Sequence, residues 1–452
     1  MNREKGSVPY RSCYYLESGI TFLPHELGFC CDRQSPATIQ PIADVGKTVD
    51  AFLEARDRVI RENQRDTPPC SGCSLFQSCG RTDGKIQYIN FGVHNYCQFA
   101  CTYCALQGAN AQDKNMPENY DALEIAKELK RRGLLSKSLH ISCASGEISI
   151  HPKRNEYYDF IEENAATVDF SSNAGKFDVR LAHILSLNSK NALIVSIDCG
   201  TPETFQRVRG VDMFERVINN LVEYRKYSPS VLLKYILLDE NCENKDLLGF
   251  IKICNDLKIL RMIITGDLRK TWGYKKSMSY EEHIVSAAIK LVEGAIDNNI
   301  FISFFDHLGQ PNLKEIHHRL LSIPSFVSAA KDLDHILSAS QVICYGAGGN
   351  CETILGRMEK LGLHKPDVLW DIKGERPRGG EISAEQFGYP ICYPDFEQLN
   401  DSSDVGMFIT ITNRAVNQNL AANMQGCGFK NVLTNDRLEL ALLAKQAEGY
   451  LK

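Results

Sequence analysis

The sequence lacks several features that would set it apart from ordinary globular proteins. It has no apolar run long enough to span a bilayer, and residues 1–7 lack the apolar core of a secretory signal. It has no internal repeat and no low-complexity tract. It has no excess of positive charge either: the formal net charge is −5, which argues against a broad nucleic-acid surface. We therefore expect a cytoplasmic protein with no membrane span and no nucleic-acid partner.

What is present is a long chain with many cysteines. With 452 residues, 43% hydrophobic and 24% charged, the chain is expected to form two or three globular domains. Nine of its 17 cysteines fall within the first 104 residues, and the other eight are scattered singly. In a reducing compartment such thiols stay available for metal rather than forming disulfides. The clustered group indicates ligation, and the scattered group indicates buried apolar side chains.

The densest motif is the run Cys97, Cys101 and Cys104, which follows an expected strand at 86–91. Three thiolates on one loop can bind a four-iron cube and leave one iron without a protein ligand. An open coordination position is typical of a catalytic rather than a structural metal site. A zinc site or three unrelated buried thiols are the alternatives. Three cysteines alone do not complete a structural zinc site, and the spacing is not that of a zinc ribbon.

This run resembles the C-x3-C-x-φ-C signature of the radical S-adenosylmethionine (radical SAM) superfamily, with Tyr103 at the aromatic position. The resemblance implies a 4Fe–4S cluster, SAM as cofactor, and a reductant such as flavodoxin or ferredoxin. It also implies reductive cleavage of SAM to a 5′-deoxyadenosyl radical that abstracts hydrogen from a substrate. The cofactors supply this chemistry and the protein positions them.

The other early cysteines resemble the auxiliary-cluster (SPASM) module of radical SAM maturases. The module normally follows the barrel, whereas here the cysteines precede it, and a further cysteine expected soon after Cys79 is absent. One auxiliary cluster is therefore expected, and a structural zinc ion at the same thiolates is the alternative. The expected ligands are Cys13, Cys31, Cys70 and Cys73, with Cys30 and Cys79 as alternates.

The pattern from 85 to 310 alternates strands and helices, which indicates β/α units and a parallel sheet. We expect an α/β fold with a partial (β/α)6 TIM-type barrel over 85–310. A Cys-rich cluster-binding region (1–84) precedes it, and a helical connector (311–338) and a Rossmann-like domain (339–452) follow. The expected barrel strands are 86–91, 138–143, 167–170, 192–197, 231–237, 260–264 and 300–304. The expected helices are 120–132, 155–163, 176–187, 213–226 and 245–257.

Polar residues follow several of these strands, where such barrels carry their chemistry. The resemblance implies that they contact the amino group, ribose and carboxylate of SAM. They are Gly146, Glu147, Ser172, Asn173, Ser196 and Arg209. A surface turn at Gly146 and Glu147, and solvated charges at Arg207 and Arg209, are the alternatives. The strand-end cysteines Cys143 and Cys199 are either hydrogen-atom donors or small core residues, and the catalytic base is not identified.

The last segment begins with a strand at 341–345 that runs into a glycine turn and a helix, as in a Rossmann unit. Gly346 would permit the tight turn, and Gly348 the close approach of a phosphate to the helix N-terminus. Asp371, at the end of the next strand, could accept a hydrogen bond from a ribose hydroxyl. A nucleotide site at these three residues is a hypothesis, because the glycine fingerprint is incomplete.

Three functions follow from these features. The first is a radical SAM enzyme that oxidises, epimerises or rearranges a small, sugar- or nucleotide-linked substrate. The second is a SPASM-type maturase of ribosomal peptides. The third belongs to another class: an iron–sulfur redox sensor or assembly protein without turnover, which would not need the SAM-side residues.

Overall fold

A computed structural model describes most of the chain, in two compact units, Met1–Tyr274 and Lys275–Lys452. The described residues are 10–30, 36–71, 73, 75–78, 82–92, 94–104, 115–267, 269, 281–306, 308, 310–371, 384–386, 389–394 and 404–451. Two expected cluster ligands, Cys31 and Cys79, lie outside them. None of the described helices is both long and apolar enough to cross a membrane. The four-part division of the chain stays a prediction.

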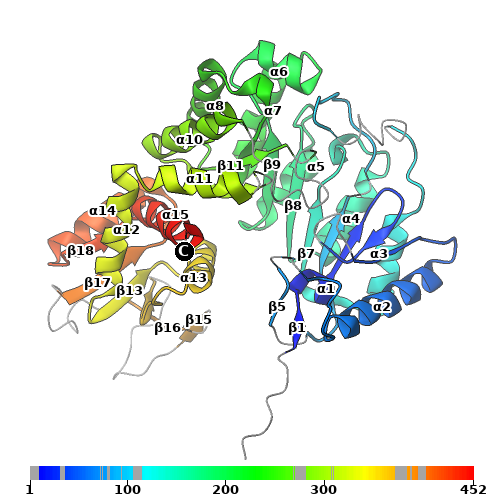
Figure 1. Cartoon of the computed structure of the whole chain (residues 1–452), viewed down its shortest axis with the longest axis horizontal. Coiled ribbons are helices and arrows are strands. Elements are labelled where there is room, and N and C mark those ends of the chain that lie inside the picture. The colour runs from blue at the N-terminus through cyan, green and yellow to red at the C-terminus, as the bar shows by residue number, and fades with distance from the viewer. Residues whose placement is uncertain are drawn as a thin grey trace, which may run out of the picture. The chain divides into compact units, whose positions relative to one another are not determined.

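The sheet of the first unit contains parallel strands that pair with one another in chain order (Figure 1). They are β6 (Ile86–Phe91), β7 (Leu135–Cys143), β8 (Thr167–Ser172), β9 (Ala192–Ser196), β10 (Val231–Leu237) and β11 (Arg261–Gly266). These strands confirm the predicted β/α series. Because parallel strands share one carboxyl-terminal edge, the residues that follow them gather there. No pairing closes this sheet into a barrel in the described part of the chain.

Helices connect these strands, and each buries one apolar face. They are α3 (Ala122–Arg131), α4 (Arg154–Asn164), α5 (Val179–Leu187), α6 (Pro202–Arg209), α7 (Phe214–Tyr227) and α8 (Asn244–Asp256). In α3 the side chain of Asp121 caps the amino end by accepting from the N–H of Glu124, and Leu123 and Leu129 are buried. Short 3-10 turns, η3 (Ile148–Ile150) and η4 (Asp239–Asn241), follow β7 and β10.

The Cys-rich N-terminal segment adds to this sheet. β2 (Gly19–Phe22) pairs parallel with β6, and β3 (Leu27–Gly28) and β4 (Thr38–Ile39) extend it antiparallel. β1 (Arg11–Ser12) pairs with β5 (Gln77–Ser78) in a separate two-stranded ladder. The helices here are α1 (Tyr14–Ser18) and α2 (Val45–Glu62). The N-terminal segment that precedes β6 therefore belongs to the same sheet as the strands that carry the three-cysteine loop.

The second unit contains a sheet in the order β15-β16-β14-β13-β17-β18, parallel except for the β15–β16 pair. The central strand β13 has its successor β14 on one side and β17 on the other, which is the order of doubly wound sheets. The strands of this sheet are β13 (Gln341–Tyr345), β14 (Val368–Trp370), β15 (Ala384–Gln386), β16 (Tyr389–Cys392), β17 (Val405–Ile409) and β18 (Asn431–Leu433), and the strand β12 (Phe301–Asp306) is not part of it. The helices are α10 (Glu282–Asp297), α11 (Gln310–Leu320), α12 (Pro324–Leu337), α13 (Gly349–Lys360), α14 (Arg414–Gly426) and α15 (Asn435–Leu451).

Candidate functional site

The three-cysteine loop follows β6 and is held by the carboxyl end of α6. The N–H of Ala100 donates to the carbonyl of Arg209 at 3.1 Å, and the N–H of Thr102 donates to the carbonyl of Val208 at 2.9 Å. Gly210 caps α6 with φ 70°, and a Cβ there would lie 2.5 Å from the carbonyl oxygen of Ala100. The loop is thus attached through its backbone to a helix more than 100 residues later in the chain.

The thiols on this loop lie close enough to affect one another. Burial raises the pKa of Cys101 to about 11, with smaller contributions from Cys97 and Cys104, while Arg209 opposes the rise. Burial also raises the pKa of Cys97. Cys101 is buried, whereas Cys97 and Cys104 are partly exposed. Three converging soft sulfur donors, two of them accessible, fit an iron–sulfur cluster with an open iron.

Tyr103, on the same loop, contacts a buried ion pair. Its hydroxyl donates to Oδ2 of Asp198 at 2.5 Å, and Nη1 of Arg209 lies 2.8 Å from the same oxygen. Nη1 of Arg209 also contacts the Tyr103 hydroxyl, and the guanidinium lies over the rings of Phe99 and Tyr103. The N–H of Ile236 on β10 donates to Oδ1 of Asp198. The residue predicted to bind SAM, Arg209, therefore couples the loop to the sheet.

The turn after β7 packs directly against the start of the loop. Gly146 has φ 63°, and a Cβ there would lie 2.4 Å from the carbonyl oxygen of His94. The N–H of Glu147 donates to the carbonyl of Tyr96 at 2.7 Å. The hydroxyl of Ser145 donates to the carbonyl oxygen of His94. The glycine is thus required for both its left-handed conformation and its close approach.

The side chain of Glu147 binds the end of β8. Its Oε2 accepts from the N–H of Asn173 at 2.7 Å and from the hydroxyl of Ser172 at 2.9 Å, while Oε1 accepts from Ser149. Burial raises the pKa of Glu147. The amide of Asn173 in turn donates to Sγ of Cys97 at 3.5 Å. Four predicted residues, Gly146, Glu147, Ser172 and Asn173, therefore form one connected group with the first cluster thiol.

The remaining predicted residues of this unit occupy other positions. Ser196 is the last residue of β9, and Arg207 donates to Thr204 and to the carbonyl of Glu240. Cys143 and Cys199 are both buried, the thiol of Cys199 donates to the carbonyl of Ile197, and burial raises the pKa of both thiols. Their role as hydrogen-atom donors stays a prediction.

Three of the cysteines predicted for an auxiliary site lie near one another. Burial raises the pKa of Cys13, and the thiols of Cys70 and Cys73 add to the rise. Asn63 donates from its amide to Sγ of Cys70 at 3.3 Å. Cys30 is partly exposed at the end of the β2–β3 hairpin. These thiols fit an iron–sulfur or a zinc site, which share their ligand type.

In the second unit, the glycine turn follows β13 and leads into α13. Gly346 has φ 102°, and its N–H donates to the carbonyl of Trp370. Asp371 accepts from the N–H of Ala347 at 2.8 Å, so the predicted ribose acceptor contacts the turn itself. Gly348 caps α13, and no atom of the described residues lies within 4 Å of where its Cβ would be. A nucleotide site at Gly346, Gly348 and Asp371 stays a prediction.

Two features of the first unit were not anticipated from the sequence. Asp198, the counter-ion of Arg209, is one. The other is a buried group of His94, Glu118 and His151, whose possible ligand atoms lie within 4.8 Å of one another. Their separations in the chain follow no motif, and only the shared strand edge brings them together.

Comparisons with known proteins agree with the cluster-loop geometry. The radical SAM superfamily profile matches residues 92–251. A probable GTP 3′,8-cyclase of Saccharolobus solfataricus is 27% identical over 139 residues, 30% of this chain and 42% of the relative. A GTPase Obg of Brachyspira hyodysenteriae is 25% identical over 270 residues, 57% of this chain and 38% of the relative. The chain thus spans about two fifths of the curated relatives it matches.

Among solved structures, Streptococcus suis SuiB bound to the precursor peptide SuiA aligns with a TM-score of 0.38 and 13% identity, over 59% of this chain and 55% of SuiB. The profile match covers the three-cysteine loop, the Gly146 turn and the strands β7 to β10. The match therefore identifies a radical SAM domain at residues 92–251 of this chain.

Proposed function

We propose that the protein is a radical SAM enzyme that acts on a small, sugar- or nucleotide-linked substrate. Cys97, Cys101 and Cys104 would hold a 4Fe–4S cluster. The cluster and SAM, when bound, supply one electron and the 5′-deoxyadenosyl radical that abstracts hydrogen from the substrate. The observation that carries the proposal is the connection between the thiols and the SAM-side residues: Asn173 contacts Cys97 and is itself held by Glu147.

The protein's own residues have positioning roles in this proposal. Glu147 holds the strand-end residues Ser172 and Asn173 in place while Gly146 brings the adjoining turn against the loop. Arg209 and Asp198 keep the loop on the sheet. Such preorganisation is what a protein contributes when cofactors carry the reaction. Gly346, Gly348 and Asp371 would hold the nucleotide portion of the substrate.

The test is anaerobic reconstitution with iron and sulfide, followed by SAM and dithionite, with 5′-deoxyadenosine measured by mass spectrometry. We expect product from the unmodified protein and none from Cys101→Ala. The control is Cys427→Ala, which removes an exposed thiol of the second unit and should change nothing. Product at the parent rate from Cys101→Ala would refute the loop assignment. Absence of product from every sample would favour the sensor or assembly function.

The substrate class is open to a direct screen. The Saccharolobus relatives are named for a reaction of GTP, which supports beginning with nucleotides and nucleotide sugars. A thermal-shift screen of the full chain should find a nucleotide that raises the melting temperature, and Asp371→Ala should reduce that shift.

A maturase of ribosomal peptides is the second candidate, favoured by the proximity of Cys13, Cys70 and Cys73. An auxiliary 4Fe–4S cluster would bring the iron content of the reconstituted protein to about eight per chain, because each such cluster holds four irons. A content of four irons would leave no auxiliary cluster and would weaken this candidate.

A further inference from the structure

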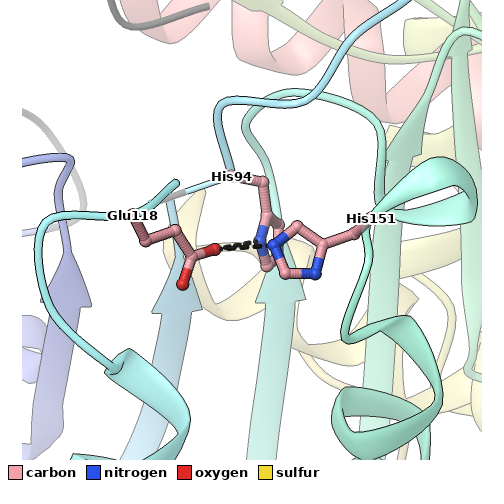
Figure 2. A group of neighbouring side chains, drawn as sticks. All are labelled: His94, Glu118 and His151. Atoms are coloured by element: carbon pink, nitrogen blue, oxygen red, sulfur yellow. Dashed lines mark hydrogen bonds and ion pairs between the residues drawn. The ribbon is translucent and has the colours of Figure 1, made fainter. Parts of the chain in front are cut away.

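A group of three side chains lies beside the cluster loop but takes no part in the proposed radical chemistry. His94 is three residues before Cys97, Glu118 precedes α3, and His151 follows η3. Figure 2 shows the carboxylate of Glu118 directed at the two imidazole rings. The side chains are almost completely buried: His94 is 0% exposed, His151 3% and Glu118 9%.

Two of the three distances in the group are close to those between ligands of one metal ion, and all three are within 4.8 Å. Oε1 of Glu118 lies 2.9 Å from Nε2 of His151 and 3.4 Å from Nδ1 of His94. Zinc bonds of about 2.0–2.1 Å in a tetrahedron place neighbouring ligand atoms about 3.3 Å apart. Two imidazole nitrogens with one carboxylate oxygen form a recurrent zinc donor set, in which the fourth position stays open.

Hydrogen bonding accounts for only part of the group. Nε2 of His94 and Nε2 of His151 are both buried without a hydrogen-bond partner. The 2.9 Å contact of His151 with Glu118 is an ion-pair distance but lacks hydrogen-bond alignment. A buried nitrogen without a partner is costly, and a metal ion that accepts the lone pair of Nε2 of His151 would relieve that cost; coordination of His94 through Nδ1 leaves its Nε2 unchanged. Oε2 of Glu118 accepts from the hydroxyl of Tyr157 at 3.3 Å, as an outer partner of a ligating carboxylate does.

The group lies at the wall of a pocket of about 230 Å³, lined in part by Glu118, His151 and Asp121. The pocket gives an ion a route in and leaves room for a water molecule at the fourth position.

We propose that His94, Glu118 and His151 form a zinc site that joins three loops beside the cluster loop. The ion would connect the segment that leads into Cys97 with the loops after β7 and before α3. One contact must change on binding. The N–H of Lys153 donates to Nδ1 of His151 at 3.1 Å, whereas coordination at Nε2 leaves the ring proton on Nδ1. Zinc loading is therefore expected to alter the backbone at Lys153.

The experiment uses the full chain after its cysteine sites have been filled by anaerobic iron–sulfur reconstitution. Zinc is titrated against a competing chelator, and bound zinc is counted by mass spectrometry. We expect one zinc per chain, with an X-ray absorption spectrum showing nitrogen and oxygen at about 2.0–2.1 Å and no sulfur near 2.3 Å. Glu118→Gln should weaken binding by at least about 100-fold, since even outer-shell changes cost 10–100-fold. The matched control Asp121→Asn, at the pocket carboxylate paired with Lys153, should retain the zinc.

Two results would overturn the proposal. Sulfur in the zinc spectrum would place the ion at cysteines. Equal affinity in the unmodified protein and Glu118→Gln would mean that the group is only a carboxylate between two histidines that bind no metal. If Glu118→Gln does not fold by circular dichroism, His94→Gln replaces it. The absorption spectrum of the unmodified protein needs no variant, and neither readout depends on SAM cleavage.

Discussion

Removing the carboxylate of Asp198 tests how the cluster loop is attached to the sheet. Its side chain is fully buried, that of Arg209 is 5% exposed, and the two atoms of their ion pair are 2.8 Å apart. Asp198→Ala leaves the guanidinium as a buried charge without its counter-ion, a change that costs about 3–5 kcal/mol. It also deprives the hydroxyl of Tyr103 and the N–H of Ile236 of their acceptor.

The measurement is the melting temperature of the first unit, recorded by calorimetry under anaerobic conditions. For a unit of this size each kcal/mol corresponds to about 2 °C, so a fall of about 6–10 °C is expected. The iron content after reconstitution should fall with it, because Tyr103 lies between Cys101 and Cys104 in the loop. Asp256→Ala is the control, since its ion pair with Lys252 is on the surface and should contribute little.

A double variant separates the ion pair from simple loss of packing. Asp198→Ala with Arg209→Leu removes both charges and should be more stable than the sum of the two single effects, by about 0.5–3 kcal/mol. Additive effects, or a fall of less than 2 °C in the single variant, would refute the view that this pair holds the loop.

Three further predictions concern other parts of the chain. Gly146→Ala should destabilise the first unit by about 2–4 kcal/mol, because it adds a Cβ in a left-handed conformation against a backbone carbonyl. The control Gly356→Ala on α13, where no described atom lies near the added Cβ, should not destabilise the protein. Equal melting temperatures of the two variants would contradict this prediction. Cys73→Ala should lower the iron content while part of the SAM cleavage remains, and an unchanged iron content would exclude Cys73 as a ligand. Burial holds the pKa of His317 at about 4, so the unfolded chain binds more protons there between pH 6.5 and 4. The second unit should therefore lose up to about 3 kcal/mol as the pH falls through that window. His317→Leu should remove this dependence and His318→Leu should not; an unaltered pH profile in His317→Leu would refute it.

The repeating elements and the cluster motif were open to prediction because their signals are local. β6 and β10 were predicted to the residue, and the other four parallel strands to within about three residues at either end. The cysteine run and the residues after each strand were located by the same logic, since parallel strands bring their carboxyl ends to one edge. The short helix α6 was not predicted, although Thr201 and Pro202 form a standard amino-terminal cap there.

The contacts that hold the site were not predictable from spacing. Arg209 was expected to contact SAM, yet its nearest partners are Asp198 and Tyr103. Glu147 was expected at the cofactor, and its carboxylate binds Ser172 and the backbone of Asn173. Each of these contacts depends on which polar groups are left without water when the loops pack, and that is decided by the completed fold.

The sequence by itself determined the series of β/α units, the sulfur donors on one loop and the set of polar residues at one sheet edge. These follow from periodicity and from spacing within a few residues, which physical chemistry constrains locally. Only the tertiary structure decided that α6 holds the loop through its carbonyls, that Asp198 neutralises Arg209, and that His94, Glu118 and His151 converge. Those groups are 11 to 109 positions apart along the chain, and burial makes each depend on partners that no local pattern specifies.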